Sequence, residues 1–413
     1  MNDQMNNYYE NTPKPRFSTA IKILIAVGIV LVVILVQFFV FSGFTFGSDR
    51  DMRFDNTGLG VSYNFDSSPV FHSNDNRLFF TASRDGVSFR PSNGVLEWNA
   101  THSFTSPIVA ARGEILAIGD YRGRNVFVYN EDGLFFTVEL EAGLISMSVT
   151  ASGLLTAIVS YDTGFGVYVY NENINSYPGL FYWSVHEGEG MQFPTHAETS
   201  EDGRYIAIAV AHLDVFIETH LQFRYINQRD AWNTDRGLFN TQILDRQLVT
   251  NMSFMNNNRF VVGTTSNLIG FQVGPSHGFA NELWREPLNN RLSHLEFFGG
   301  AHFVTITDDR IPGVDESDPV GMVRIFNSNG VETGNFNLGR RATHLRTGHN
   351  ALILGTDRNF HAIDFRGSPL WSHTSIYDTR DILFLDNTDT ILIAASSRAD
   401  VYRRRRVRAN DEN

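Results

Sequence analysis

Short apolar runs recur along the chain and are separated by polar turns. Eight of them have the length of a strand, and they begin at Arg77, Glu114, Leu154, Arg204, Arg259, His302, Ala351 and Thr390. Several runs are apolar at consecutive positions, as in "EILAIGD" and "TILIAAS", which is typical of a strand buried on both faces. Because they recur roughly every 40 to 50 residues, they indicate a repeated unit such as a propeller blade or a solenoid turn.

Each apolar run is predicted to be the second strand of a four-stranded unit. A first short strand precedes it, and an Asp, Asn or Gly turn joins the two, as in "SEDGR" at Ser200. A third strand such as "NVFVYN" follows, then a turn and a fourth strand such as "LFFTVEL". The stretch "GDYRGRNVFVYNEDG", from Gly119 to Gly133, therefore holds the predicted hairpin between the second and third strands and the turn that follows.

Eight such units, with no helical segment between them, predict an all-β fold. The predicted architecture is an eight-bladed β-propeller of four-stranded antiparallel blades over residues 58–405, and a seven-bladed ring is the alternative. The last unit, which begins at Asp381, lacks a fourth strand, whereas "GLGVSYNF" at residues 58–65 belongs to no unit. We expect this N-terminal strand to complete the last blade, because an open ring would leave an unpaired strand edge.

An apolar segment near the N-terminus predicts a membrane anchor. Between Ile23 and Phe41 there is no charge and one polar residue, Gln37, and a helix of this length crosses the ~30 Å hydrocarbon core of a bilayer. A cleaved signal peptide is the alternative, but its apolar region is shorter and no matching cleavage site follows. We therefore predict one transmembrane helix that contacts the membrane through residues 21–42, within an anchor and flank at residues 20–46.

The charges on either side of this segment predict its orientation. Lys14, Arg16 and Lys22 precede it, whereas Arg50 and Arg53 follow it and are interleaved with aspartates. Positive charge favours the cytoplasmic side, so the N-terminus is expected in the cytoplasm and the propeller outside it, at the cell membrane. The other predicted segments are a cytoplasmic tail, a linker and a C-terminal polar tail, at residues 1–19, 47–57 and 406–413.

Composition narrows the possible chemistry. The 413 residues include no cysteine, which excludes disulfides, thiolate metal sites and cysteine nucleophiles. A net charge of −12 argues against nucleic acid as a partner, and no glycine-rich phosphate loop, nucleophile motif or cofactor signature occurs. The run "RRRRVR" from Arg403 to Arg408 is expected to be a final edge strand made safe by charge, followed by a polar tail. The alternative is a contact to lipid headgroups or an anionic wall polymer.

Several stretches resemble known propeller repeats. "TSEDGRYIAIAV" resembles the hairpin of WD-repeat-like propellers, and "GSPLWSHT", "NGVLEWNAT" and "NELWRE" resemble a strand of quinoprotein-like propeller repeats. The resemblance extends from Gly58 to about Arg405. With the single anchor, the chain also resembles an uncharacterised family of membrane-anchored, single-pass propeller proteins of Gram-positive bacteria. The resemblance implies a fold and no activity, since WD dipeptides and a quinone-binding set are missing and no catalytic residue is carried over.

Three histidines take the same place in their repeats, at the start of first strands. They are His196, His294 and His344, and Asn251 and Asp381 share that level. Such side chains can approach the mouth of a central channel. Three imidazoles and a carboxylate on one axis can hold a divalent metal or a small anionic ligand. The alternative is that each side chain binds a backbone group inside its own blade.

One loop concentrates carboxylates and is the other candidate metal site. The stretch "TDDRIPGVDESDPVG" contains Asp308, Asp309, Asp315, Glu316 and Asp318. Calcium prefers oxygen ligands of this kind, but the spacing fits no known calcium-loop pattern. A solvated insertion between two strands is the preferred interpretation.

Two functional hypotheses from different classes follow from the sequence. The first is a non-catalytic module on the outer surface of the membrane, whose ring presents loops to a protein, a glycan or a cell-wall component. The second is a propeller enzyme, a hydrolase or lyase with a site at the channel mouth. Such an enzyme needs a pair of acid and base groups ~5–10 Å apart, and the sequence identifies no such pair. The first hypothesis is therefore preferred.

Overall fold

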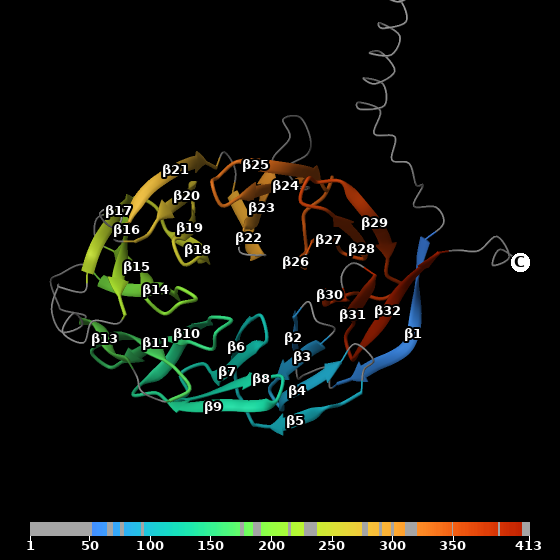
Figure 1. The fold of residues 1–413 in the computed structure, drawn as a ribbon, viewed down its shortest axis with the longest axis horizontal. Helices are drawn as coiled ribbons and strands as arrows, with labels where there is room; N and C mark the ends of the chain where they lie inside the picture. The colour runs from blue at the N-terminus through green and yellow to red at the C-terminus, as the bar shows by residue number, and fades with distance from the viewer. Residues whose placement is uncertain are drawn as a thin grey trace, which may run out of the picture. The chain divides into compact units, whose positions relative to one another are not determined.

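The computed structural model describes a propeller. It covers residues 52–63, 69–74, 78–91, 95–173, 177–184, 191–213, 216–226, 238–274, 280–288, 291–298, 301–309, 320–348, 350–386 and 389–406. The chain divides into Met1–Asp51 and Met52–Asn413, and the second unit contains eight four-stranded antiparallel sheets (Figure 1). The prediction of an all-β, eight-bladed propeller is confirmed, and the seven-bladed alternative is excluded. The predicted anchor lies outside the described residues.

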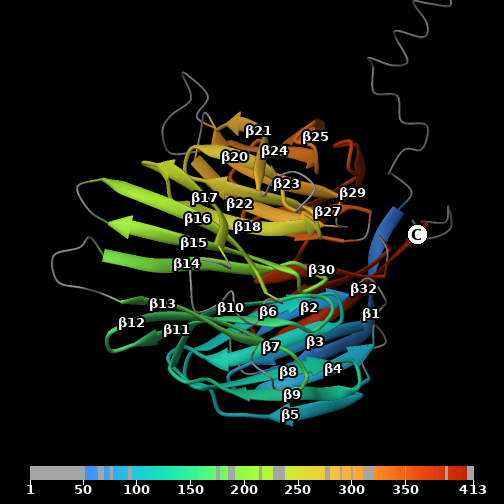
Figure 2. The same cartoon turned by 60° about the vertical axis from the view of Figure 1, so that its left-hand side comes forward.

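Seven blades consist of consecutive strands. The first four contain β2 (Val70–Asn74), β3 (Leu78–Ser83), β4 (Gly86–Pro91) and β5 (Trp98–Thr101); β6 (Pro107–Arg112), β7 (Ile115–Asp120), β8 (Asn125–Asn130) and β9 (Gly133–Glu139); β10 (Gly143–Val149), β11 (Leu155–Tyr161), β12 (Gly164–Tyr170) and β13 (Tyr177–Ser184); and β14 (Met191–Thr199), β15 (Tyr205–Leu213), β16 (Ile217–Tyr225) and β17 (Leu238–Asp245). Figure 2 shows the four strands of blade 4, β14 to β17, side by side in chain order.

The remaining blades follow the same order, except that the last one recruits the N-terminal strand. They contain β18 (Val249–Asn256), β19 (Arg259–Thr264), β20 (Asn267–Gln272) and β21 (Asn281–Pro287); β22 (Arg291–Phe298), β23 (His302–Asp309), β24 (Val320–Asn327) and β25 (Glu332–Asn337); β26 (His344–Thr347), β27 (Leu352–Thr356), β28 (Asn359–Ile363) and β29 (Pro369–Thr374); and β30 (Asp381–Asp386), β31 (Thr390–Ala394), β32 (Arg398–Arg406) and β1 (Met52–Ser62).

Apolar side chains of the described residues form eight clusters, one at each interface between neighbouring blades. One cluster joins Val128 of blade 2 to Ala157 of blade 3, for example, and another joins Val304 of blade 6 to Leu354 of blade 7. The second strands carry much of this burial, and every residue of β27 and β31 is buried. Blades on both sides therefore explain why the second strands are apolar at consecutive positions.

The strand β1 closes the ring by pairing with β32, and it becomes the outermost strand of blade 8. It begins at Met52, before the predicted start at residue 58, so the prediction that residues 52–57 belong to a linker is wrong. The extra length is explained by β32, because Met52 to Asn56 pair with Arg406 to Tyr402. Asp55 also forms an ion pair with Arg405. Because β32 lies between β31 and β1, and Arg403 pairs with residues of both, the prediction that the arginine run begins in an edge strand is wrong.

Both neighbouring blades contact β1. The ring of Phe54 packs edge-on against Trp371 of blade 7, with a centroid distance of 4.7 Å. Val61 joins the apolar cluster that contains Phe71 of blade 1. The closing strand thus supplies backbone hydrogen bonds to its own blade and apolar contacts to the blades on either side.

The closing strand provides a test of the fold by single substitutions. We expect Phe54→Ala to lower the free energy of unfolding by about 2 kcal/mol, because it removes most of a large apolar side chain packed on Trp371. Leu59→Ala on the same strand is the matched control, since Leu59 is 38% exposed, and its effect should stay below about 0.5 kcal/mol. Thermal and urea unfolding measure both changes. Equal stability of the two variants would contradict the closing role of β1.

Candidate functional site

The five residues predicted at the channel mouth occupy equivalent positions on the innermost strands. Each pairs with a residue of the second strand: the pairs are His196 and Ala209, Asn251 and Gly263, His294 and Ile306, His344 and Gly355, and Asp381 and Ala394. His344 and Asp381 begin their strands as predicted, whereas His196 and His294 lie inside β14 and β22, which begin earlier. The innermost strands are β2, β6, β10, β14, β18, β22, β26 and β30, and they surround the centre of the ring (Figure 1). These five residues form the first polar level.

Members of the first polar level bind the backbone of the next blade. The Nε2 atom of His344 lies 3.2 Å from the carbonyl oxygen of Arg380, and the Nδ2 group of Asn251 donates to the Leu295 carbonyl over 2.7 Å. His196 forms a hydrogen bond with the backbone of Thr250 in the same manner. Innermost strands have one free edge, and these side chains satisfy backbone groups along it. The alternative of a partner within the same blade therefore does not describe these three bonds.

Two imidazoles of the first polar level are neutral because they are buried. Burial lowers the pKa of His196 and of His344 below the usual range, which outweighs the hydrogen bonds from the neighbouring backbone. In His294 the Nδ1 atom lies 3.2 Å from the hydroxyl of Ser293. Within the described ranges, no three His, Cys, Asp or Glu side chains are arranged to hold a metal ion. The structure therefore does not bring these three imidazoles together as metal ligands.

Most of the acidic loop lies outside the described residues. Asp308 and Asp309 lie at the end of β23 and pair with Gly321 and Val320 of β24. Asp315, Glu316 and Asp318 fall between these strands, outside the described residues. The calcium hypothesis stays a prediction.

A second polar level lies two residues further along the innermost strands, and the sequence analysis missed it. Its polar members are His72, Ser148, Glu198, Ser253, Glu296 and Arg346. A signal was present, because residues two apart on a strand share a face, and both His196 and His294 are followed two positions later by glutamate. Ser148 and His72 again bind the next blade, through the carbonyls of Ala197 and Gly113.

Arg346 joins three blades at this level. Its Nε and Nη2 atoms donate to the two carboxylate oxygens of Asp381 in blade 8, each over 3.0 Å. Its Nη1 atom lies 3.6 Å from Glu296 in blade 6. Burial raises the pKa of Glu296 to about 7, although Arg346 opposes the shift and Asp381 adds to it. The Glu296 side chain is 30% exposed, but protein on its other sides removes enough bulk water to favour the neutral acid.

Arg112 crosses the ring between blades that are not neighbours. It lies at the end of β6 in blade 2, and its Nε atom is 2.7 Å from the carboxylate of Glu201 in blade 4. Its Nη1 and Nη2 atoms donate to the Ser253 hydroxyl and the Phe254 carbonyl in blade 5, over 3.2 and 2.9 Å. Burial raises the pKa of Glu198 to about 8, with Arg112 opposing the shift and Glu201 adding to it. The centre of the ring thus holds two arginine clusters and two carboxyl groups that bind protons near neutral pH.

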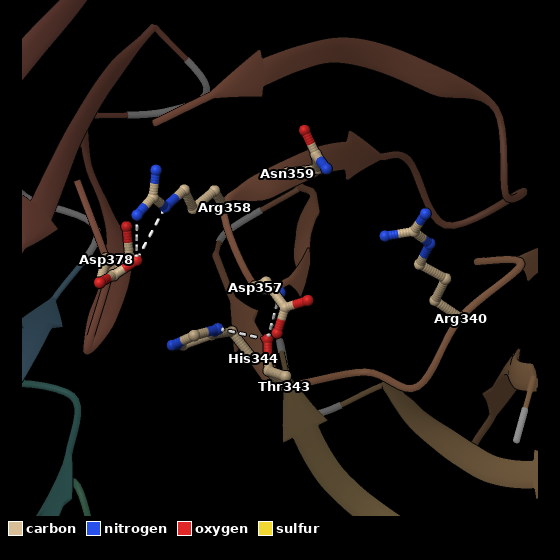
Figure 3. Close-up of a pocket in the computed structure, with 8 residues that line it drawn as sticks. Arg340, Thr343, His344, Asp357, Arg358, Asn359 and Asp378 are labelled. Carbon is tan, nitrogen blue, oxygen red and sulfur yellow. Dashed lines mark hydrogen bonds and ion pairs between the residues drawn. The ribbon is translucent and has the colours of Figure 1, made fainter. Parts of the chain in front are cut away.

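A hollow of about 540 Å³ lies at the end of blade 7 where the loops between blades emerge. Its lining residues come from the loop before β26, the β27–β28 hairpin and the loop before β30, and they are Arg340, Thr343, His344, Asp357, Arg358, Asn359, Asp378 and Thr379 (Figure 3). A second hollow of about 350 Å³ shares Arg340 and Asn359 with it. Of the predicted site residues, His344 lines the first hollow. We call the two together the blade-7 groove.

The geometry defines a β-propeller whose polar hollow lies on a loop face and whose centre is crossed by ion pairs. The chain belongs to a family of unknown function (DUF5711), which matches residues 68–403. No curated protein matches the chain. Within the described parts of the chain, no helix could cross a membrane.

Solved structures with this fold come from several kinds of protein. The C-terminal WD40 domain of Sif2 is 11% identical, with 85% of this chain and 98% of that chain covered and a TM-score of 0.54. Sqt1 of Saccharomyces cerevisiae is 11% identical, with 85% and 97% covered and a TM-score of 0.51. Dipeptidyl peptidase 4 of Porphyromonas gingivalis is 10% identical, with 81% and 56% covered and a TM-score of 0.53. The likeness shows the fold alone and confirms the WD-repeat-like expectation.

The two central carboxyl groups make stability depend on pH. In the folded chain Glu198 and Glu296 keep protons that the unfolded chain releases from about pH 4.5 upwards. The contribution of these two groups to the free energy of unfolding should therefore fall as the pH rises from about 4.5 to 8, whereas histidines with a lowered pKa, such as His196 and His344, contribute in the opposite direction. Glu198→Gln should remove part of this loss, on the order of a few kcal/mol, because one pKa unit corresponds to about 1.4 kcal/mol.

Urea unfolding at pH 5.5 and pH 8.5 measures the effect. Glu139→Gln is the control, since that side chain is 76% exposed, and it should leave the difference between the two pH values unchanged. A Glu198→Gln variant whose stability changes between pH 5.5 and pH 8.5 by the same amount as that of the parent protein would contradict a raised pKa at this position.

Proposed function

We propose that this chain is a membrane-anchored interaction module whose propeller lies outside the cytoplasm. Residues 21–42 form the anchor in this proposal, and the charge bias before residue 23 sets the orientation. The propeller then holds a protein, glycan or cell-wall component at the membrane surface. The fold supports binding as its role, since a rigid ring of blades keeps many loops on one face in fixed positions.

The observation that carries the proposal is the contrast between the ring centre and the blade-7 groove. At the centre Arg112 and Arg346 are paired with carboxylates and backbone groups of other blades, so that their charges serve to join blades. In the groove the exposed guanidinium of Arg340 has no side-chain hydrogen bond or ion pair with a described residue. Unsatisfied donors in an open hollow suit a polar partner from solution.

A second candidate function is a hydrolase or lyase with its site at the ring centre. The observation that favours it is the pair Glu198 and Glu296, because carboxyl groups with pKa values of about 8 and 7 suit proton transfer near neutral pH. Neither of the two hollows of the groove includes these residues. Glu296 is also held by Arg346, which binds Asp381 at the same time. The interaction module is therefore the better supported function.

Protease treatment of intact cells tests the proposed location. Protease added outside the cells should digest the chain beyond residue 51. A known cytoplasmic protein of the same cells, used as the control, should stay intact. Removal of residues 1–46 should move the chain from the membrane fraction to the soluble fraction, because the apolar segment is lost. Full protection in intact cells, with digestion only after lysis, would overturn the orientation.

Crosslinking in cells tests the proposed binding surface. We expect Arg340→Glu to reduce the yield of partner crosslinks at least fivefold, since it reverses the charge of the unpaired guanidinium. Arg366→Glu is the matched control, because Arg366 is an exposed arginine in the turn at the other end of β28. Equal losses in the two variants would place the partner elsewhere on the propeller.

A further inference from the structure

The blade-7 groove offers hydrogen-bond donors and acceptors side by side, and this combination points to the chemistry of its ligand. Arg340 supplies unpaired donors, as described above. The Oδ1 atom of Asn359 accepts a hydrogen bond from Thr374 over 2.9 Å, which leaves the amide N–H groups without a described partner. The carboxylate of Asp357 accepts no hydrogen bond from a described side chain. Figure 3 shows these three residues around the hollow.

The backbone holds Asp357 in place. Its φ of 57° lies in the left-handed region, which is uncommon for a residue other than glycine. Its amide N–H donates to the hydroxyl of Thr343 over 2.9 Å, and Thr343 is itself bonded to the carbonyl of Gly355 over 3.2 Å. Asp357 is the first residue of the two-residue turn between β27 and β28, where a left-handed conformation suits a tight hairpin. The carboxylate is thus presented by the tip of the β27–β28 hairpin.

The groove also contains an ion pair whose partners a ligand can replace. Arg358 donates to Asp378 with its Nε atom, over 2.7 Å (Figure 3). The side chains are 51% and 89% exposed, so water competes for both partners and the pair is weak. A ligand with hydroxyl or carboxylate groups can therefore replace one partner of this ion pair at little cost.

The charges of the groove nearly cancel, which limits the ligand. Two arginines, Arg340 and Arg358, face two aspartates, Asp357 and Asp378. Burial lowers the pKa values of the lining histidines, so these are neutral at pH 7 and add no positive charge; they are His344, His361 and His373. A site for a polyanion such as polyphosphate would carry donors alone, because aspartates repel such a ligand.

Hydroxyl groups are the ligand groups that both donate and accept, so they match a lining of carboxylate, amide and guanidinium. The planar fork of an arginine with no partner also fits a carboxylate with two parallel hydrogen bonds. We propose that the blade-7 groove binds a saccharide that carries a carboxylate, with Arg340 on the carboxylate and with Asp357 and Asn359 on ring hydroxyls. This inference rests on the proposed function and names the ligand class of the same surface.

A matched pair of probes tests the ligand class. Full-length protein in detergent is titrated calorimetrically with methyl galacturonoside, a saccharide with one carboxylate, and with its methyl ester, which keeps the ring hydroxyls and masks the carboxylate. The acid form should bind at least tenfold more tightly than the ester. Arg340→Gln should weaken the acid form about tenfold, to the level of the ester, whereas Asp357→Asn should weaken both forms. Arg366→Gln, at the other end of β28, should change neither affinity.

Three results would overturn the inference. The first is no binding of either probe at millimolar concentration, and the second is equal loss in Arg340→Gln and Arg366→Gln. The third is tighter binding of a short polyphosphate than of the acid saccharide, which would indicate attraction by charge alone. If both saccharides fail to bind while Arg340→Glu still abolishes partner crosslinks in cells, the proposed interaction function stands and only the ligand class is wrong.

Discussion

The pairing of β1 with β32 is the interaction on which the rest of the structure depends. Strands β30 to β32 form an incomplete sheet, and only a strand from the other end of the propeller completes it. Once paired, β1 places Phe54 against blade 7 and Val61 against blade 1, so the first and last blades are held next to each other. A closed ring in turn restricts the distance between opposite innermost strands, which Arg112 of blade 2 spans to reach blades 4 and 5.

The free edges of the innermost strands explain why the first polar level, which the sequence suggested as a ligand site, instead holds neighbouring blades together. A strand at the edge of a sheet leaves half of its backbone groups unpaired. Here polar side chains of one blade bind the innermost strand of the next, as Asn251 binds Leu295 and His344 binds Arg380. Polar residues recur at these positions, so the sequence alone suggests a ligand site there. They recur because every blade has an innermost strand whose free backbone groups require hydrogen bonds from a neighbouring blade.

The fold was largely predictable from sequence, whereas the groove was not. Each blade is encoded locally by an apolar run between turns, so β27 and β31 were recognisable without knowledge of their neighbours. The start of β1 at Met52 was missed because it depends on the length of β32, far away in the chain. The groove joins residues 340, 357 and 378 from three separate loops, and its shape depends on the left-handed backbone of Asp357. The spacing of residues in the sequence does not predict that these three loops lie close together.

The ring centre and the groove have different lining residues, but β26 contributes to both. Arg346 binds Asp381 with two hydrogen bonds and so joins β26 to the start of β30. Two residues before Arg346, His344 binds the carbonyl of Arg380, and the ring of His344 lines the groove. The central ion pair therefore sets the position of one wall of the groove. Weakening of this pair would loosen the groove before it unfolded the ring, since the apolar contacts between blades 7 and 8 do not involve either charged group.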